Sequence, residues 1–504
     1  MKTITKQNDG FSGTLTDEVR IRMNDAFEIF RTFFNQKYGK SLVVKGNPGS
    51  GKTTFSLELA AKLVDSQPIH YLSSRFTDEP LKENFDFIDQ ISYRMKQRES
   101  EGKKDLKYVS TESLKKLEGI IEETNMKKDN DFSGGLVFDI TEVIPEINEI
   151  YNFVEKNIDR SPLIILDSIE ALAEKYHIDS TLIFSVFQND LVEKSGAGLV
   201  VVLESTGNER LEYYSDGVVS LNNRIVQNYL VRKLRIEKLR GISIGSLPIY
   251  SYTLLNGRFT IFDSLNLDYP RRKIGMPGVA EIPPNKVPLG GEEIGKLLQR
   301  GGNAVDLGSI VLFHRNTISD RTEMAVDLLK NSLVRTTIAD GRGAMDVSSS
   351  SYETLKVLMS TTEPDYLTHY ITAEKTKRTN QFIINLEGKS MISDFPMEVI
   401  EFFMASSKRP NVYIFSTDFL NFTYGENFIG ELLSLINELR VTGIIVIIAD
   451  DNYYGKLSHY AYLTIHFMDV EGCIYLNTGS DDHFVIETKI DDNGWTDYKL
   501  TKTV

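Results

Sequence analysis

Residues 46–54 read GNPGSGKTT and fit the phosphate-binding pattern G-x-x-x-x-G-K-[ST] in full. A short β-type run, Ser41 to Val44, precedes this loop, and a helix-forming stretch, Phe55 to Leu63, follows it. This is the context that the pattern requires, because the backbone N–H groups of the loop must converge at the electropositive start of a helix. We therefore expect the loop to bind a nucleoside triphosphate, ATP. The alternative is a glycine-rich turn that happens to carry a lysine.

Each residue type in the loop has an expected role. Lys52 supplies a point charge to the β- and γ-phosphates, and Thr53 supplies a hydroxyl for Mg²⁺. The residues expected to contact the nucleotide are Gly46, Asn47, Pro48, Gly49, Ser50, Gly51, Lys52, Thr53 and Thr54.

A second run, Leu163 to Asp167, has four aliphatic residues followed by an aspartate. Such a run is typical of a buried parallel strand whose carboxyl end presents an acidic group, and ligands of α/β proteins bind at those ends. We expect Asp167 to hold the Mg²⁺ shell, directly or through water. Its alternative role is to cap the helix that follows.

A chain of 504 residues is too long for one ordinary core. Prolines and glycines gather between Pro270 and Pro288, which indicates a boundary between domains. We expect an ATP-binding domain over 1–265, a proline-rich linker over 266–289 and a second domain over 290–504. The Lys- and Glu-rich stretch from about 80 to 130 is expected to be helical.

The second half repeats the pattern of the first without its motif. The strand Ser309 to Phe313 is followed by 314–321, which has neither the glycines nor a Lys-Thr pair. A strand at 411–418, a helix at 426–440 and an apolar strand from Gly443 to Ala449 then repeat the earlier spacing. We therefore expect an α/β fold whose second domain has lost the phosphate loop.

Acidic residues outnumber basic residues by 71 to 57, which gives a formal net charge of −14. This balance argues against a protein that coats nucleic acid or binds anionic membranes. The apolar runs are too short to span a bilayer, and the single cysteine, Cys473, allows no intrachain disulfide. The histidines show no metal-ligand spacing. We expect a cytoplasmic protein without a membrane anchor.

Four segments in this order resemble the KaiC/GvpD branch of the RecA superfamily of ATPases. They are the phosphate loop, the strand to Asp167 with Ser168 to Leu172, the run Tyr214 to Leu221, and Arg235 to Gly241. Within the branch, the chain is similar to the gas-vesicle regulator GvpD group. The resemblance covers about 15–265, and over 290–500 only the strand order is similar. It implies tandem RecA-like domains, the second of them degenerate.

The resemblance also implies a regulatory ATPase that acts through partner proteins and forms a homo-oligomer, with nucleotide between neighbouring subunits. In that family a Lys-x-Arg-Gly segment reaches the γ-phosphate of the adjacent protomer, and here it maps to Lys238 and Arg240. A cation that arrives in trans neutralises charge that develops during phosphoryl transfer. Without the resemblance, 235–240 is a solvated basic strand.

The chain departs from the superfamily at one position. A catalytic glutamate usually ends the strand after the phosphate-loop helix, where this chain has Ser73 and Ser74. Serine cannot take a proton from the attacking water, so we expect slow hydrolysis unless Asp78, Glu79 or Glu204 orients the water.

Two other function classes stay open. A DNA-dependent ATPase of the recombinase type is favoured by the basic stretch 224–240, and opposed by the acidic total charge. The third class is a paralogue that needs ATP only for folding or assembly. Likeness of fold cannot separate these classes.

Overall fold

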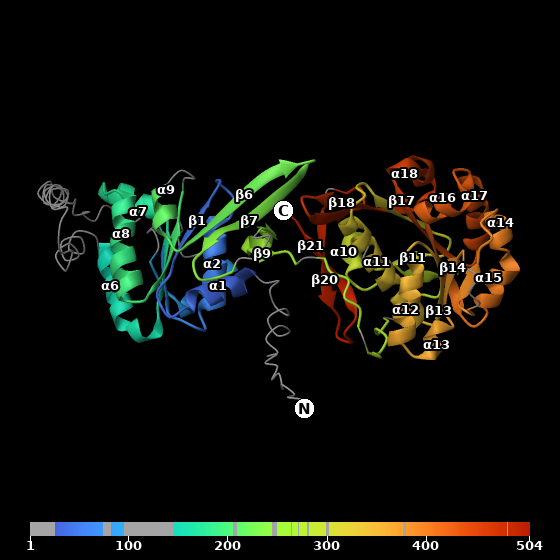
Figure 1. Cartoon of the computed structure of the whole chain (residues 1–504), viewed down its shortest axis with the longest axis horizontal. Helices are drawn as coiled ribbons and strands as arrows, with labels where there is room; N and C mark the ends of the chain where they lie inside the picture. Colours follow the sequence, from blue (N-terminus) through green and yellow to red (C-terminus); the bar gives the residue numbers. More distant parts are fainter. Residues whose placement is uncertain are drawn as a thin grey trace, which may run out of the picture. The chain divides into compact units, whose positions relative to one another are not determined.

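The computed structural model describes residues 26–73, 82–94, 145–204, 209–243 and 249–503, with gaps at 264, 271, 280–281, 299–301, 376–379 and 481. The chain divides into two compact units. The first comprises Met1–Ile225 and Leu230–Ile261, and the second Val226–Tyr229 and Phe262–Val504. Each unit is a mixed α/β structure with a large, mostly parallel sheet (Figure 1).

The sheet of the first unit has the strand order β3-β2-β4-β5-β1-β6-β7-β8-β9. The strands from β3 to β6 are parallel, and β7, β8 and β9 add an antiparallel extension. Their bounds are β1 Ser41–Gly46, β2 Ile69–Ser73, β3 Ser92–Arg94, β4 Leu163–Asp167, β5 Gly198–Val202, β6 Gly217–Val226, β7 Tyr229–Leu239, β8 Ile249–Thr253 and β9 Thr260–Ile261.

Helices cover both faces of this sheet. One face carries α1 (Ala26–Phe34) and α2 (Lys52–Leu63), and the other carries α6 (Pro145–Lys156), α7 (Ile169–Tyr176) and α8 (Ser180–Phe187). Successive side chains of a strand point to opposite faces. Leu42 and Val44 therefore pack with α1 and α2, whereas Val43 packs with α6 to α8. This explains why the central strands are unbroken aliphatic runs.

Several predicted elements are confirmed. The run at 163–167 forms β4, the run at 41–44 lies in β1, and the helix-forming stretch 55–63 lies in α2.

The helix predicted through 80–130 is wrong for part of its described portion. Residues 88–94 form a short 3₁₀ turn, Ile88–Gln90, and the edge strand β3. Phe85, Phe87 and Ile91 are buried in the same core as α1 and α2. This burial outweighs the helical preference of the charged residues around it.

The sheet of the second unit has the order β15-β14-β13-β16-β17-β12-β18-β19-β20-β21, and β10 and β11 form a separate pair. The bounds are β10 Lys286–Pro288, β11 Ala304–Asp306, β12 Ile310–Arg315, β13 Arg342–Val347, β14 Tyr370–Glu374, β15 Ile383–Asn385, β16 Lys408–Ser416, β17 Gly443–Asp450, β18 Leu463–Val470, β19 Cys473–Asn477, β20 Phe484–Ile490 and β21 Thr496–Lys502.

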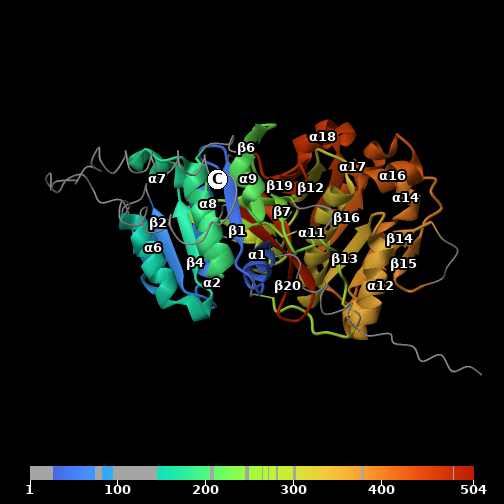
Figure 2. The same cartoon turned by 60° about the vertical axis from the view of Figure 1, so that its left-hand side comes forward.

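Helices again cover both faces (Figure 2). One face carries α10 Ile294–Leu298, α11 Asp320–Ala339, α12 Ser351–Thr361 and α13 Pro364–Leu367. The other carries α14 Met391–Asp394, α15 Met397–Phe403, α16 Thr417–Tyr424, α17 Phe428–Leu439 and α18 Asp451–Leu457.

The two large sheets share one strand order. The parallel part of the first sheet has the order β3-β2-β4-β5-β1-β6, and that of the second has the order β14-β13-β16-β17-β12-β18, with β15 added next to β14. When the strands of each set are numbered along the chain, the two orders are the same. In both units an antiparallel extension of three strands continues from the last parallel strand. The carboxyl end of β12 therefore corresponds to the carboxyl end of β1, from which the phosphate loop starts.

The proline-rich segment is bound to the second unit. The Trp495 indole Nε1 donates to the carbonyl oxygen of Gly275 at 2.8 Å, and the Ile274 N–H donates to that of Thr361 at 2.9 Å. Trp495 is buried, so this stretch is held by the core beside it.

A buried ion pair joins α11 to β13. Lys330 and Asp346 have no exposed surface, and Lys330 Nζ lies 3.1 Å from Asp346 Oδ2. Lys330 also donates to Ser348 Oγ at 3.0 Å, and the Tyr370 hydroxyl donates to Asp346 Oδ2 at 3.2 Å. Although burial lowers it, the charges of Asp346 and Asp327 raise the pKa of Lys330, so the amine stays protonated.

Replacing Asp346 by Asn should destabilise the second unit, because the charge of Lys330 would remain buried with weaker compensation. Breaking a buried pair costs about 3–5 kcal/mol. Urea unfolding of the full chain, followed by hydrogen exchange in α11, measures the loss. As a control, Lys356→Gln removes an exposed pair with Glu353 and should cost at most about 1 kcal/mol. Equal stabilities of the two variants would contradict this account.

Candidate nucleotide site

The loop between β1 and α2 has the backbone of an anion cradle. Gly49 and Gly51 have φ angles of 73° and 85°, which only glycine adopts without steric cost. A Cβ at Gly46 would lie 2.1 Å from the carbonyl oxygen of Leu221, and one at Gly51 would lie 2.7 Å from the side chain of Leu254. The glycines of the motif are thus required by backbone conformation and by close packing.

The N-terminus of α2 is open to an anion. Its N-cap residue Gly51 provides no side-chain acceptor, whereas Ser168 caps α7 and Asp179 caps α8. The first N–H groups of a helix need acceptors from outside, and the helix dipole favours a negative charge there. Within the described residues, the buried Ser50 Oγ also has no hydrogen-bond partner. Phosphate oxygens would supply the missing acceptors, so these residues fit a nucleotide.

Lys52 lies over the loop. Its Nζ donates to the carbonyl oxygen of Gly46 at 2.6 Å and to that of Asn47 at 3.4 Å. These bonds hold the ammonium group against the cradle, where phosphate oxygens can share it. Thr53 and Thr54 follow in the first turn of α2, and both are half-buried.

Asp167 ends β4 at the same edge of the sheet. Its side chain is buried, and Oδ2 accepts a hydrogen bond from the Tyr71 hydroxyl at 2.9 Å. Burial and the charge of Asp167 raise the pKa of Tyr71, so the hydroxyl stays a donor. Mg²⁺ is commonly held by one or two protein oxygens together with substrate phosphates, and Thr53 and Asp167 offer such oxygens. In the described parts of the chain, no group of three or more His, Cys, Asp or Glu could hold a metal by itself.

Glu204 follows β5, the strand next to β1. Its Oε1 accepts from Ser168 Oγ at 2.7 Å, and its N–H donates to Glu170 Oε1 at 3.1 Å. These bonds join the ends of β4 and β5. Among the predicted water-orienting carboxylates, only Glu204 lies in the described chain; Asp78 and Glu79, like Ser74, lie outside it.

Lys238 is engaged within its own chain. Its Nζ donates to the carbonyl oxygens of Glu212 and Tyr213, each at 3.1 Å, and of Ser215 at 2.5 Å. These carbonyls lie at the C-terminal end of α9 (Glu209–Tyr214), where a cation is stabilising. Burial and the charge of Arg240 lower the pKa of Lys238. Lys238 would have to leave these carbonyls to reach another subunit's phosphate.

Arg240 is more available. Its side chain is 55% exposed, and Nη1 lies 3.5 Å from Asp216 Oδ1. Asp216 Oδ2 in turn accepts from the backbone N–H and the hydroxyl of Ser41. The contact is long and its arginine side is exposed to solvent, so Arg240 can exchange it for another contact.

Sequence reasoning did not find Lys45, which precedes the loop. Its Nζ lies 2.7 Å from Glu212 Oε2 on α9 and 3.0 Å from Glu237 Oε2 on β7. Although burial lowers it, these carboxylates raise the pKa of Lys45 above its ordinary value. The phosphate-loop strand is therefore tied to α9 by a contact between residues 167 positions apart, which no local pattern indicates.

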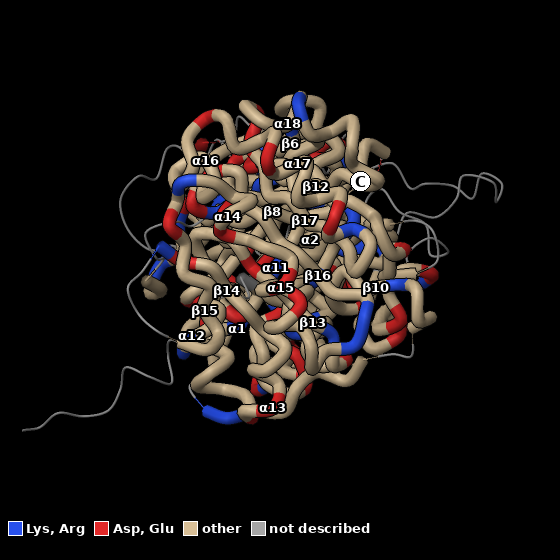
Figure 3. The backbone as a smooth tube through the Cα atoms, turned by 90° about the vertical axis from the view of Figure 1, so that its right-hand side faces the viewer, with Lys and Arg blue, Asp and Glu red and all other residues tan. Residues whose placement is uncertain are grey.

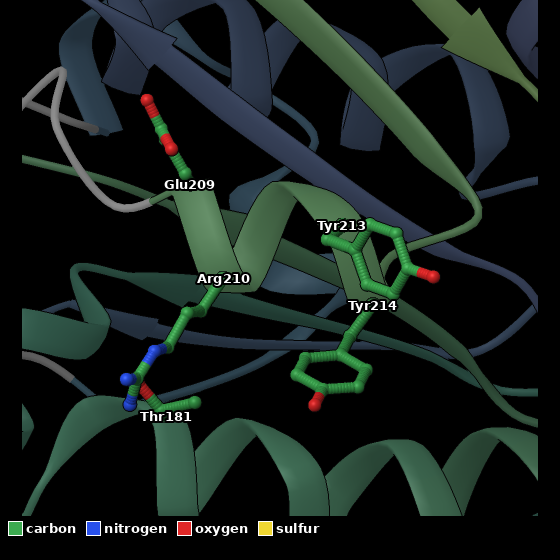
Figure 4. Close-up of a pocket in the computed structure, with 5 residues that line it drawn as sticks. All are labelled: Thr181, Glu209, Arg210, Tyr213 and Tyr214. Carbon is green, nitrogen blue, oxygen red and sulfur yellow. The ribbon is translucent and has the colours of Figure 1, made fainter.

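A pocket of about 470 Å³ lies beside α9 and is lined by Thr181, Glu209, Arg210, Tyr213 and Tyr214. Figure 4 shows Arg210 directed toward Thr181 and Glu209 directed away from it. The tyrosines are 75% and 54% exposed. Exposed tyrosine together with arginine is typical of protein-contact surfaces.

The corresponding edge of the second unit is closed by its own side chains. β12 ends at Arg315, which is buried and forms ion pairs with Glu323 and Asp418. The N-terminus of α11 is capped by Ser319 Oγ, which accepts from the Thr322 N–H at 3.1 Å. The carboxyl end of β12 therefore holds a guanidinium paired with two carboxylates. The carboxyl end of β1 instead leads into a glycine-containing loop and a helix without a side-chain cap.

Fold and loop together define an α/β P-loop protein, a class in which the helix after the first strand is shaped to receive phosphate. Two family models match the chain: "GvpD gas vesicle protein, P-loop domain" over residues 30–237 and "GvpD basic region 2" over residues 315–501. The chain belongs to the GvpD gas vesicle protein family.

Two curated relatives come from Halobacterium salinarum. Protein GvpD1 is 28% identical over 238 residues, which is 47% of this chain and 40% of the relative. Protein GvpD2 is 26% identical over 242 residues, 47% of this chain and 44% of the relative. The chain thus spans less than half the length of the relatives it matches. In the described residues, no helix has the length and apolar character of a membrane span.

Replacing Lys238 by Met should loosen α9, because three carbonyl oxygens lose a charged donor. We expect amide exchange in 209–216 to rise by about fivefold or more, as for the loss of one or more net hydrogen bonds. The matched control is Arg235→Met, which changes an exposed side chain on the same strand. Unchanged exchange in α9 would show that Lys238 does not cap this helix.

Proposed function

We propose that the chain is an ATP-binding, slowly hydrolysing regulatory ATPase of the KaiC/GvpD kind, which acts through partner proteins in gas-vesicle regulation. The observation that carries the proposal is the uncapped start of α2, with left-handed Gly49 and Gly51 and with Lys52 over the loop. A helix start without a side-chain cap directs backbone N–H groups toward the loop, and phosphate oxygens are suitable acceptors for them.

We also infer that both units are RecA-like and that the second is a degenerate copy. The common strand order supports this inference. So does the pairing of Arg315 with Glu323 and Asp418 at the end of β12, together with the capped start of α11. On this inference only the first unit, over about 1–265, binds nucleotide, and 290–504 is the degenerate domain.

In the proposed mechanism, the loop N–H groups and Lys52 hold the β- and γ-phosphates. Thr53 and Asp167 provide oxygens for Mg²⁺, which neutralises charge on the phosphates when it is bound. Glu204 orients the attacking water, and its bond with Ser168 sets the direction of its carboxylate. Arg240 acts in trans on a neighbouring subunit of a homo-oligomer and leaves Asp216 to do so.

The recombinase-type alternative needs a free basic surface. Within the stretch 224–240, Lys238 donates to carbonyl oxygens at the end of α9, and Lys233 donates to Ser251 Oγ at 2.5 Å. Figure 3 shows Lys and Arg interspersed with Asp and Glu along the backbone. Together with the net charge of −14, these contacts favour the regulator over the DNA enzyme.

We assign partner contact to the pocket at α9. The guanidinium of Arg210 fits a carboxylate, and the exposed rings of Tyr213 and Tyr214 fit an apolar side chain next to it. A partner segment with an acidic residue beside an apolar one therefore matches this surface. Glu212 of the same helix forms an ion pair with Lys45 of β1, the strand that leads into the phosphate loop. This ion pair connects the pocket helix to the nucleotide site.

Replacing Lys52 by Ala should weaken ATP binding, because the charge on the phosphates is lost. A charge-assisted contact contributes about 1.5–3 kcal/mol, or roughly 10- to 150-fold in affinity. Calorimetric titration of the full chain measures it, and Lys62→Ala, an exposed residue of the same helix, is the control. Unchanged affinity in the Lys52 variant would remove the site assignment. Two bound ATP molecules per chain would contradict the degeneracy of the second unit.

Replacing Arg240 by Ala should lower ATP hydrolysis or ATP-driven assembly while the chain stays folded. Mixing it with the Lys52→Ala chain should restore part of the activity, at interfaces that pair an intact loop with an intact arginine. If the basic stretch binds DNA instead, Arg240→Ala should lower the salt dependence of DNA binding by about one unit of log-log slope. Steeply salt-dependent DNA binding that stimulates hydrolysis would favour the recombinase-type function.

A further inference from the structure

Tyr252 contacts the phosphate loop from outside the motif. Its hydroxyl donates to the carbonyl oxygen of Ser50 at 2.5 Å, across 202 positions of sequence. The side chain is 2% exposed. Burial raises the pKa of Tyr252, against the opposing effect of Arg232, so the hydroxyl remains a donor at neutral pH.

The orientation of one peptide group follows from this bond. A trans peptide is planar, so its C=O and N–H point in opposite directions. The carbonyl of Ser50 and the N–H of Gly51 belong to the same peptide. When Tyr252 holds the carbonyl on the β8 side, the Gly51 N–H must point away from β8, into the cradle. Gly51 follows this peptide and would otherwise let it rotate, because glycine accepts either sign of φ.

The tyrosine itself is held rigidly. Its ring stacks on Phe259 with centroids 4.2 Å apart, and Phe259 meets Phe55 of α2 edge to face at 5.2 Å. Two positions after Tyr252, the Leu254 side chain packs against Gly51. The strand β8 and the start of α2 are thus joined by one aromatic cluster, so the hydroxyl cannot move far from Ser50.

We propose that Tyr252 is a positioning residue for the nucleotide site: its hydroxyl fixes the Ser50–Gly51 peptide so that the Gly51 N–H meets a phosphate oxygen. This inference rests on the proposed nucleotide binding and adds to it a determinant from the antiparallel extension. The class of ligand is any compound with a phosphate chain, because the directed group is a backbone donor. The nucleoside is not recognised by this contact.

The test is Tyr252→Phe, which keeps the ring and removes only the hydroxyl. Calorimetric titration of the full chain with ATP and with inorganic tripolyphosphate should show that both affinities fall by the same factor, about 5- to 10-fold, the loss expected for one hydrogen bond. The control is Tyr250→Phe, a half-buried tyrosine of the same strand, which should leave both affinities unchanged. A merely structural role would lower the thermal midpoint without changing the two affinities together.

The outcomes separate the two proposals. A wild-type chain that binds neither ATP nor tripolyphosphate overturns the nucleotide site and the role of Tyr252 with it. Wild-type binding that Tyr252→Phe leaves unchanged, or a loss for ATP alone, overturns only the role of Tyr252. If the variant folds poorly, amide exchange of the wild-type loop decides: tripolyphosphate should protect the Gly51 N–H, and an unprotected Gly51 refutes the inference.

Discussion

The first unit is organised around the start of α2, where the chain provides no side-chain acceptor for the first backbone N–H groups. The N–H groups at the start of α2 have no side-chain cap, whereas α7 and α8 are capped by Ser168 and Asp179. The surrounding contacts preserve this state. Gly46 allows the loop to pass close to Leu221, and Tyr252 holds the Ser50 carbonyl on the outside. Donors kept without acceptors in a fixed geometry bind an anion with little reorganisation.

In the second unit, the chain itself provides the acceptor at the corresponding helix start. This unit has the same strand order, but its corresponding helix α11 has a serine cap and its strand ends in a paired arginine. The Ser319 hydroxyl supplies from within the chain the acceptor that a ligand would supply from outside, and Glu323 and Asp418 supply the negative charge opposite Arg315. A sheet of this topology therefore does not need a phosphate loop to be complete.

The sequence predicts those parts that depend on neighbouring residues. The strands β4 and β5 are aliphatic runs because both faces are buried, and the phosphate loop is local in sequence. The contacts of Tyr252 and Lys45 join distant segments, so no pattern indicates them. The hydrogen bond from Trp495 to Gly275 in the proline-rich segment likewise joins residues 220 positions apart, so composition does not indicate it. The family resemblance implies a role in trans for Lys238, and it does not indicate the hydrogen bonds from this side chain to the carbonyl oxygens at the end of α9.

The ion pair between Lys45 and Glu212 has a thermodynamic consequence. If α9 has a different arrangement with and without nucleotide, any molecule that prefers one arrangement must change the affinity for nucleotide. Reciprocity makes the factor the same in both directions. One coupling free energy then relates the affinity of the phosphate loop for nucleotide to the affinity of the α9 surface for its ligand. A partner that tightens ATP binding must itself bind more tightly to the ATP-loaded chain.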